Sequence, residues 1–210
     1  MGKAWVKDRK RDPYYRKAKA EGYRSRAAYK LLQIQDRFHV IHPGDTVIDL
    51  GAAPGGWSQV AHELGASTVV AVDQEPMTPL EGVTFVQADL GDEAELASLA
   101  KRAGGFADVV LSDMAPRLSG NRSLDHARSM DLADRSLRVA HQVLREGGHL
   151  VTKVFQGDLY PAFRRRVRDA FARSKDFSPP ASPRGSAELY LVARGRRGPG
   201  AAVGTFNTRA

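Results

Sequence analysis

The stretch "TVIDLGAAPGGWSQ", residues 46–59, decides the fold, because it joins a short apolar strand to a glycine-rich turn and then to a helix. The strand is predicted over residues 46–50 and the helix over residues 57–65. Glycines let the backbone of such a turn approach a ligand closely, and the first turn of the following helix offers free amide donors. The unit therefore predicts a ligand-binding loop at the carboxyl end of a buried strand.

Strands and helices alternate along the rest of the chain. Near-continuous apolar strands separated by helices are typical of α/β proteins with a mostly parallel sheet that is covered on both faces. Further strands are predicted at residues 67–73, 83–89, 107–113, 148–155 and 188–193, with a short one indicated around 176–178. Helices are predicted at residues 93–103, 123–145 and 158–173, and from a cap at Ser25 to about Phe38.

Length and composition limit the class of protein. A chain of 210 residues favours one domain with a sizeable core. The absence of cysteine excludes disulfides and thiolate metal sites. No apolar run is long enough for a membrane span, and the first residues have no secretory signal, so we expect a cytoplasmic protein, a monomer, with no membrane partner. The domain is predicted at residues 23–195, with a basic, partly disordered extension at 1–22 and a flexible tail at 196–210.

Charge is unevenly distributed along the chain. Residues 1–39 hold 12 Lys and Arg against 4 Asp and Glu, and residues 161–210 hold 11 against 3, whereas residues 40–160 hold 9 against 17. Basic ends are typical of proteins that bind a polyanion, although solvated termini would give the same pattern. Aromatic residues in the first basic segment favour nucleic acid, because bases stack on such rings. These residues are Trp5, Tyr14, Tyr15 and Tyr23.

Charged residues mark the carboxyl ends of the predicted strands, where ligands bind in open α/β sheets. Any single one could be a helix cap or a turn former, but acids at four consecutive strand ends indicate a binding crevice. These acids are Asp49, Asp73, Asp89 and Asp113. Lys153 lies late in the next strand among core residues, and a lysine is rarely buried without a partner.

Three kinds of ligand compete for the glycine loop. A phosphate-binding P-loop needs a Gly-Lys-Ser/Thr ending, which is missing, and a dinucleotide loop needs G-x-G-x-x-G, which does not fit. The third candidate is S-adenosylmethionine (SAM), which carries a carboxylate, an amine and a ribose but no phosphate. Asp73 lies about 20 residues after the glycines, where it can accept both ribose hydroxyls. Asp89 is placed to meet the adenine edge, so the pattern favours SAM.

Several motifs resemble those of one known family. The segments "YRSRAAYKL", "DLGAAPGGWSQV", "LSDMAPRLSG", "VTKVFQG" and "AELYLVA" are similar to the FtsJ (RlmE) family of ribosomal RNA ribose 2′-O-methyltransferases. The resemblance covers about residues 12–195 in the family's order and spacing. It implies a Rossmann-like SAM-dependent methyltransferase fold with seven strands in the order 3-2-1-4-5-7-6, the seventh antiparallel.

The resemblance also implies functional residues. It places the family's Lys–Asp–Lys–Glu tetrad on catalytic residues Lys30, Asp113, Lys153 and Glu188, and SAM binding on Gly55, Trp57, Asp73, Asp89 and Asp113. No metal is required. Bacterial members of the family methylate a uridine in the A-loop of 23S rRNA within the large ribosomal subunit. Related enzymes act on tRNA or mRNA caps, so the motifs define the reaction better than the RNA.

The chemistry of ribose methylation leaves two roles open for Lys153. A 2′-hydroxyl is a poor nucleophile that must be deprotonated or strongly polarised. As a neutral amine Lys153 would accept the proton, and burial and Lys30 favour that form, whereas Asp113 and Glu188 oppose it. As an ammonium it would instead stabilise the developing alkoxide. Asp113 would orient Lys153, while Lys30 and Glu188 would hold the ribose.

Two other classes of protein compete with a methyltransferase. An RNA-binding assembly factor could keep the SAM site for structure alone, although an intact tetrad argues against this. An NAD-dependent oxidoreductase is disfavoured by the loop sequence. Three arginines near the loop after the fourth strand could grip RNA phosphates or be merely solvated. They are Arg117, Arg122 and Arg128.

Overall fold

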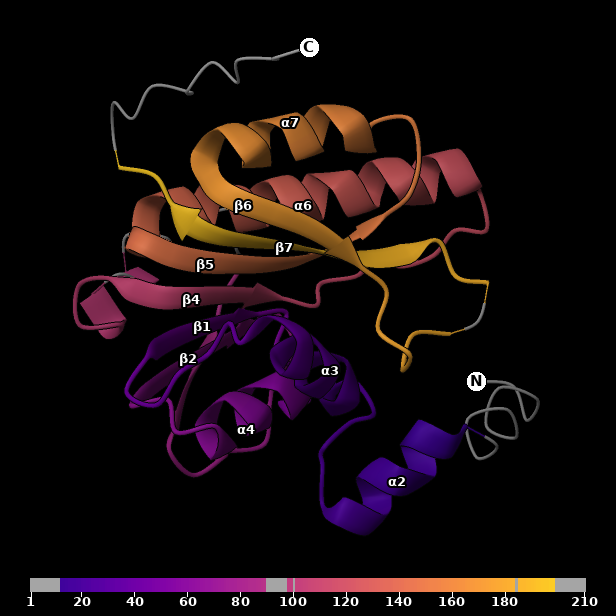
Figure 1. Ribbon diagram of the computed structural model, residues 1–210. Coiled ribbons are helices and arrows are strands. Elements are labelled where there is room, and N and C mark those ends of the chain that lie inside the picture. The colour runs from indigo at the N-terminus through magenta and orange to yellow at the C-terminus, as the bar shows by residue number, and fades with distance from the viewer. Residues whose placement is uncertain (1–11, 90–97, 100, 184, 199–210) are drawn as a thin grey trace.

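The computed structural model describes residues 12–89, 98–99, 101–183 and 185–198. In these residues one seven-stranded sheet has the order β3-β2-β1-β4-β5-β7-β6 (Figure 1). β7 is antiparallel to both of its neighbours, and the other pairs are parallel. The strands are β1 (Thr46–Leu50), β2 (Thr68–Asp73), β3 (Val83–Gln87), β4 (Ala107–Ser112), β5 (Leu144–Phe155), β6 (Phe171–Phe177) and β7 (Glu188–Arg196). The predicted fold and strand order are confirmed.

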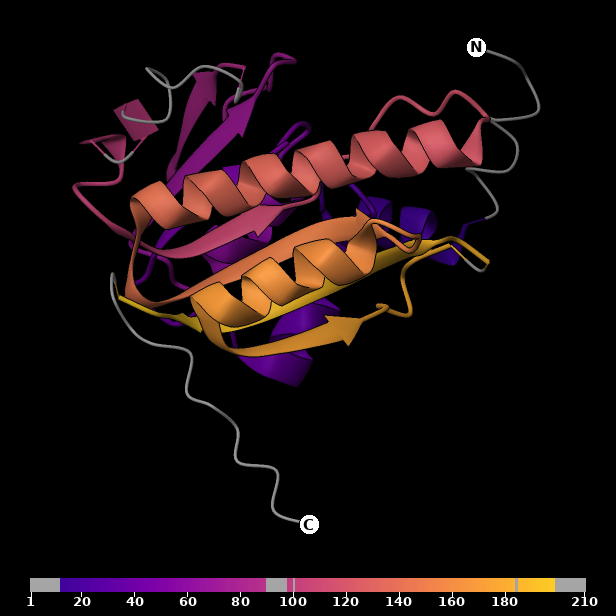
Figure 2. The same cartoon turned by 90° about the horizontal axis from the view of Figure 1, so that it is seen from above.

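Helices cover both faces of the sheet (Figure 2). The helices are α2 (Pro13–Glu21), α3 (Ala28–Phe38), α4 (Gly56–Glu63), α6 (Arg122–Val143) and α7 (Tyr160–Ala170). Successive side chains of a strand point to opposite faces, so Ile48 joins the apolar cluster under α6 and α7, while Val47 joins the cluster under α3 and α4. This double burial explains the continuous apolar runs in the central strands.

The edge strand β6 was largely missed. The sequence predicts a helix to residue 173, but α7 ends at Ala170 and the strand runs from Phe171 to Phe177. β6 pairs only with β7, and Arg173 and Lys175 on it are exposed. An edge strand with one solvated face lacks an apolar run, so its sequence continues the polar pattern of the helix before it. β5 also begins earlier than predicted, at Leu144.

Within the extension that was predicted to be partly disordered, residues 13–21 form the helix α2. Asp12 caps α2, because its carboxylate accepts from the amides of Tyr14 and Tyr15, and Gly22 ends the helix in a left-handed conformation. Ala18 is buried, and the Tyr14 and Tyr29 ring centroids lie 5.4 Å apart. An Asp-Pro start and a Gly end were therefore readable helix signals.

Some predictions fall outside the described residues. Residues 1–11, most of the predicted helix at 93–103 and the last residues of the tail are among them. Residues 98–99 and 101–102 are helical. Ser25 does not cap α3 as predicted, because the helix starts at Ala28 and Ala27 is its cap. None of the described helices combines the length and hydropathy of a membrane span.

Candidate active site

The tetrad residues meet at the carboxyl edge of the sheet. Lys153 lies near the end of β5, and Asp113 directly follows β4, which is the parallel neighbour of β5. Because β7 is antiparallel, its first residue, Glu188, reaches the same edge and pairs with Phe155 in register. Lys30 comes from α3, which packs on the sheet beside it. Residues distant in sequence are thus brought together by the topology.

Hydrogen bonds join the four side chains into two pairs. Lys153 Nζ donates to Asp113 Oδ1 at 2.9 Å and to the Asp113 carbonyl at 2.5 Å. Lys30 Nζ donates to Glu188 Oε1 at 2.7 Å. Lys30 is 8% exposed and Lys153 5%, so both amines are held in the protein interior against carboxylates. Each buried amine therefore lies against a carboxylate, and this pairing makes its burial tolerable.

Tyr190 links the two pairs and was missed in the sequence. Its hydroxyl donates to Asp113 Oδ1 at 2.6 Å and accepts from Lys30 Nζ at 3.1 Å. Burial raises the pKa of this phenol well above its ordinary value, and the charges of Asp113 and Glu188 add to the effect, so the phenol stays protonated. The available signal was its position two residues after Glu188, on the same face of the strand.

Asp113 is held as a carboxylate by its neighbours. Burial raises the pKa of this group, but the positive charges of Lys153 and Lys30 and the hydrogen bonds from Tyr190 and Lys153 outweigh it, so the pKa lies below its ordinary value. We call the cluster formed by Lys30, Asp113, Lys153, Glu188 and Tyr190 the patch. Ser182 adds a further contact to it, because its hydroxyl donates to Glu188 Oε1 at 2.9 Å. The patch is a largely buried set of charged groups, joined by hydrogen bonds, at the carboxyl ends of the strands.

The glycine loop after β1 fits tightly against the chain around it. A Cβ atom at Gly51 would lie 2.6 Å from Met114 Cγ, and one at Gly56 would lie 2.3 Å from Ser25 Oγ. Gly55 has a φ of 105°, which favours glycine, and it caps α4. The loop can therefore lie close to its neighbours only with glycine at these positions.

A pocket of about 400 Å³ opens beside the patch, a volume within the usual range for small-molecule sites. Three of the five predicted cofactor residues line it, namely Asp73, Asp89 and Asp113. Gly55 lines neither this pocket nor the smaller cavity of about 150 Å³ next to it, and Trp57 lines only the smaller one. The Trp57 indole is buried, and its nitrogen donates to the Ala27 carbonyl at 2.8 Å.

The carboxylates in the larger pocket already have partners that orient them. Asp73 accepts from the amides of Ala53 at 2.8 Å and Glu75 at 2.9 Å. A carboxylate has about four acceptor positions, so room remains for ribose hydroxyls. Asp89 pairs with Arg135 across 3.4 Å. Arg135 also lines the pocket, and nothing in the sequence predicted it.

Asp49 has one oxygen with no partner in the interior. Its side chain is fully buried, Oδ2 accepts from Ser58 Oγ at 2.6 Å, and Oδ1 has no hydrogen bond among the residues that the structure describes. Burial raises its pKa to about 7, the Ser58 hydrogen bond partly offsets this, and the charges of Asp113 and Asp73 add to it. Asp49 lines the smaller cavity, so a donor or cation bound there would satisfy the free oxygen.

Arg24 fastens the glycine loop to the loop after β2. Its guanidinium donates to the carbonyls of Thr78 and Pro79, each at 2.5 Å, and to the carbonyl of Pro54 at 3.3 Å. Its side chain also lies where a Cβ atom of Gly55 would be, within 3.1 Å. This arginine belongs to the basic segment whose charge and aromatic residues favoured nucleic acid, yet its donors are directed at the glycine loop and the loop after β2.

The comparisons with known proteins agree with this architecture. A model of the FtsJ-like methyltransferase family matches residues 23–196. The chain belongs to this family. One FtsJ-like relative, the ribosomal RNA large subunit methyltransferase E of Methanothrix thermoacetophila, is 52% identical over 184 residues, which is 88% of this chain and 72% of the relative.

Two further relatives extend the comparison. The enzyme of the same name from Archaeoglobus fulgidus is 50% identical over 189 residues, covering 90% of this FtsJ-like chain and 97% of its own. A crystal structure from Plasmodium falciparum, named as a ribosomal RNA methyltransferase, has a TM-score of 0.75 at 25% identity, covering 84% of this chain and all of its own. The predicted family is confirmed.

Proposed function

We propose that this FtsJ-like methyltransferase transfers the methyl group of SAM to the ribose 2′-hydroxyl of a uridine in the A-loop of 23S rRNA. The observation that carries the proposal is the Lys153–Asp113 pair at 2.9 Å, at the edge of a pocket that Asp113 itself lines. The names of the curated relatives support a ribosomal RNA of the large subunit as the substrate. The uridine, the A-loop and the 2′-position come from the resemblance to the family.

The residues of the two cavities fit SAM. Asp73 would accept the ribose hydroxyls and Asp89 the adenine edge in the larger pocket, and the unpartnered oxygen of Asp49 suits the cofactor's ammonium group in the smaller one. Gly55 and Trp57 would act through the loop and the start of α4, which they shape from outside the larger pocket. The bound sulfonium supplies an activated methyl group, so no metal is needed for the transfer.

The patch would prepare the 2′-hydroxyl for attack. Lys153 Nζ would take the hydroxyl proton, while Asp113 fixes the position of that nitrogen through two hydrogen bonds. Lys30 and Glu188 would hold the ribose from the α3 side. The second role, in which Lys153 remains an ammonium and stabilises the developing alkoxide, needs the same geometry. A kcat that rises with pH as an amine loses its proton supports the first role, whereas a kcat that falls as an amine loses its proton supports the second.

Methyl transfer to isolated large ribosomal subunits tests the proposal. The subunits come from cells that lack the enzyme, the methyl group of SAM is labelled, and the modified nucleotide is mapped as a 2′-O-methyl position. We expect one uridine of the A-loop to be labelled. Lys153→Ala should abolish transfer, whereas Lys101→Ala, which removes an exposed lysine, should not. Labelling of tRNA but not of the subunit would replace the proposed RNA, and no transfer to any RNA would favour a pure RNA-binding factor.

A further inference from the structure

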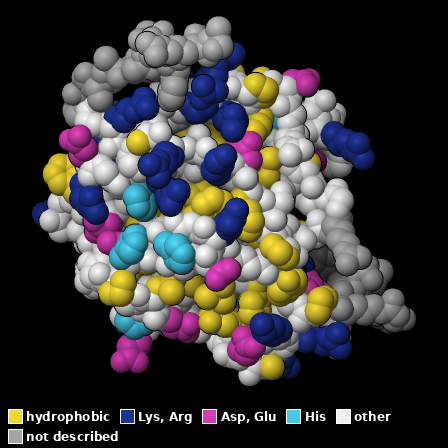
Figure 3. Space-filling view, viewed as in Figure 1, with side chains coloured by type: hydrophobic (Ala, Val, Ile, Leu, Met, Phe, Trp, Pro, Cys, Tyr) yellow, Lys and Arg dark blue, Asp and Glu magenta, His cyan; other side chains and the backbone are white. Residues whose placement is uncertain are grey.

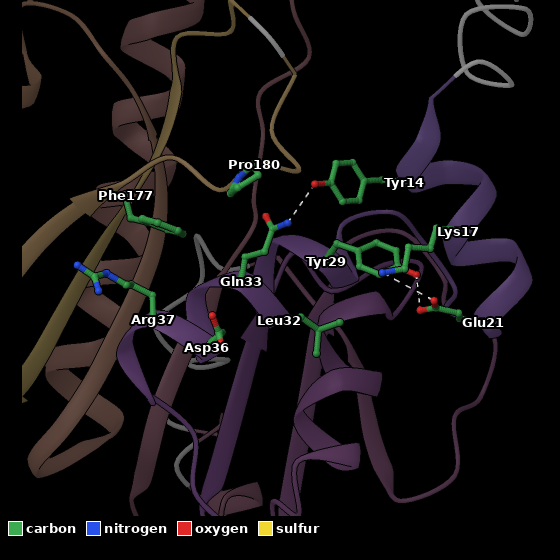
Figure 4. A pocket seen from close by; sticks show the side chains of 10 residues that line it. All are labelled: Tyr14, Lys17, Glu21, Tyr29, Leu32, Gln33, Asp36, Arg37, Phe177 and Pro180. Carbon is green, nitrogen blue, oxygen red and sulfur yellow. Dashed lines mark hydrogen bonds and ion pairs between the residues drawn. The ribbon is translucent and has the colours of Figure 1, made fainter.

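A cleft of about 500 Å³ lies on the side of α3 that faces α2 (Figure 4). It is separate from the two cavities at the strand ends, since it shares no lining residue with them. The side chains come from α2, from the outer face of α3, from the end of β6 and from the segment that follows it. They are Tyr14, Lys17, Glu21, Tyr29, Leu32, Gln33, Asp36, Arg37, Phe177 and Pro180.

Polar groups of α3 remain free in this cleft. Gln33 Nε2 donates to Tyr14 Oη at 3.2 Å and its Oε1 accepts from the Ala181 amide at 2.9 Å, which leaves one N–H and one lone pair unused. The side chains of Asp36 and Arg37 are exposed and make no hydrogen bond or ion pair with any residue that the structure describes. An amide, a carboxylate and a guanidinium thus lie within one turn of the helix.

Aromatic surface borders these polar groups. Tyr14 on one side and Phe177 on the other are half-buried, so part of each ring remains accessible (Figure 4). Tyr29 is buried beneath them, with Lys17 Nζ 4.8 Å from its ring centroid. Rings beside free donors and acceptors are the chemistry that binds unstacked bases of single-stranded RNA.

Charge favours RNA as the occupant over a protein segment. Residues 13–38 hold seven Lys and Arg against two Asp and Glu. On the same face of the molecule, Lys and Arg side chains gather over α7 and β6 (Figure 3). Exposed cations there include Arg165, Arg168, Arg173 and Lys175. A phosphate backbone that crossed this face would pass Arg37 on its way to the patch.

We propose that the cleft holds one nucleotide of the substrate RNA that flanks the methylated one. The base lies against Tyr14 and Phe177, Gln33 and Asp36 bind its polar edge, and Arg37 binds its phosphate. This inference rests on the proposed function, since it assumes an RNA substrate. The cleft is connected to the patch, because Gln33 holds Ala181 and the next residue, Ser182, donates to Glu188.

Three single variants of exposed residues test the cleft. Arg37→Glu reverses the phosphate contact, and Arg138→Glu on α6, which does not line the cleft, is the matched control. Asp36→Ala tests whether RNA affinity rises or falls when this carboxylate is removed. If the RNA met only charge at this position, loss of a carboxylate would tighten binding, whereas loss of a hydrogen bond to a base weakens it. Melting temperatures equal to wild type establish that each variant is folded.

Binding is measured by fluorescence anisotropy with a labelled single-stranded RNA of mixed sequence and no SAM, and transfer is measured on large ribosomal subunits. We expect Arg37→Glu to weaken RNA binding about tenfold and Asp36→Ala several-fold, with KM for SAM unchanged and Arg138→Glu like wild type. Equal affinities for Arg37→Glu and Arg138→Glu would overturn the proposal and leave a protein as the occupant. Tighter binding by Asp36→Ala would overturn the base contact.

The two proposals fail in distinguishable ways. If wild-type protein transfers no methyl group to any RNA, the proposed function is wrong, and the anisotropy contrast between Arg37→Glu and Arg138→Glu still decides whether the cleft binds RNA. If wild-type protein methylates the subunit and both cleft variants bind and react as it does, the cleft proposal alone is wrong.

Discussion

Replacing Asp49 by asparagine should make the stability of the protein less dependent on pH between about pH 4 and pH 8. The carboxyl group is fully buried with one unpartnered oxygen, and its pKa in the folded protein is about 7 instead of the ordinary 3.8. A raised pKa means that the folded state binds this proton more tightly than the unfolded state does. Ionisation therefore costs stability, which is intact below about pH 4 and is lost as the pH rises toward 7 and above.

The size of the effect follows from the shift. At 1.36 kcal/mol for each pKa unit, a change from 3.8 to about 7 corresponds to roughly 4 kcal/mol of lost stability above pH 8. Asparagine cannot ionise, so the variant avoids this loss. It still accepts from Ser58, but its amide nitrogen has no acceptor, which costs about 1–3 kcal/mol at every pH.

Urea unfolding followed by circular dichroism between pH 5 and pH 9 measures this effect. The free energy of unfolding of Asp49→Asn minus that of the wild type should be negative or near zero at pH 5 and should rise by roughly 3 kcal/mol by pH 9, because the part of the loss that occurs below pH 5 lies outside this range. Asp158→Asn, at an exposed carboxylate, is the control and should show no such rise. A difference that stays constant across this range would refute the argument that a charge is buried here without compensation.

Three further predictions concern single contacts. Arg24→Ala should raise KM for SAM about tenfold and leave RNA affinity unchanged, because the Arg24 guanidinium binds three carbonyls of the loops near the cofactor pocket. Steady-state kinetics check this, with Arg24→Lys as the partial rescue, and a loss confined to RNA binding would contradict it. Tyr190→Phe should lower kcat roughly tenfold with SAM binding intact, since Asp113 loses a hydrogen-bond donor at 2.6 Å. Calorimetry measures SAM binding and the transfer assay measures kcat, and an unchanged kcat would refute this role of Tyr190. Asp12→Ala should lower the melting temperature by a few degrees, through loss of the α2 cap and of the ion pair with Arg26; an unchanged melting temperature would mean that α2 adds no stability to the domain.

The central sheet was predictable because its strands are buried on both faces. β1, β2 and β4 each contain four consecutive buried positions, of which at least three are apolar, a pattern that helices and edge strands rarely show. β6 has no such pattern, since Phe171 alone is buried and its other apolar or small side chains are partly or fully exposed. Its pairing with β7 is a tertiary contact that local sequence does not encode.

The candidate site was predictable in its residue types and less so in its contacts. The resemblance named Lys30, Asp113, Lys153 and Glu188, and the sheet brings them together, but no spacing in the sequence places residue 30 beside residue 188. Tyr190 looked like one more core aromatic. Its hydroxyl contacts Asp113 and Lys30 only because β7 pairs with β5 in this register, and hydrophobic periodicity in the sequence does not specify such a contact.

The place of β7 in the sequence determines when the patch can be completed during protein synthesis. Lys30 and Glu188 are 158 residues apart, and the second arrives only with the strand that is synthesised last. At about 5–20 residues per second, roughly 2–7 s of translation separate the end of β5 at Phe155 from the synthesis of Glu188. Nascent chains stalled before residue 188 should therefore pair the first five strands and remain inactive, so that catalytic competence appears abruptly at the end of synthesis.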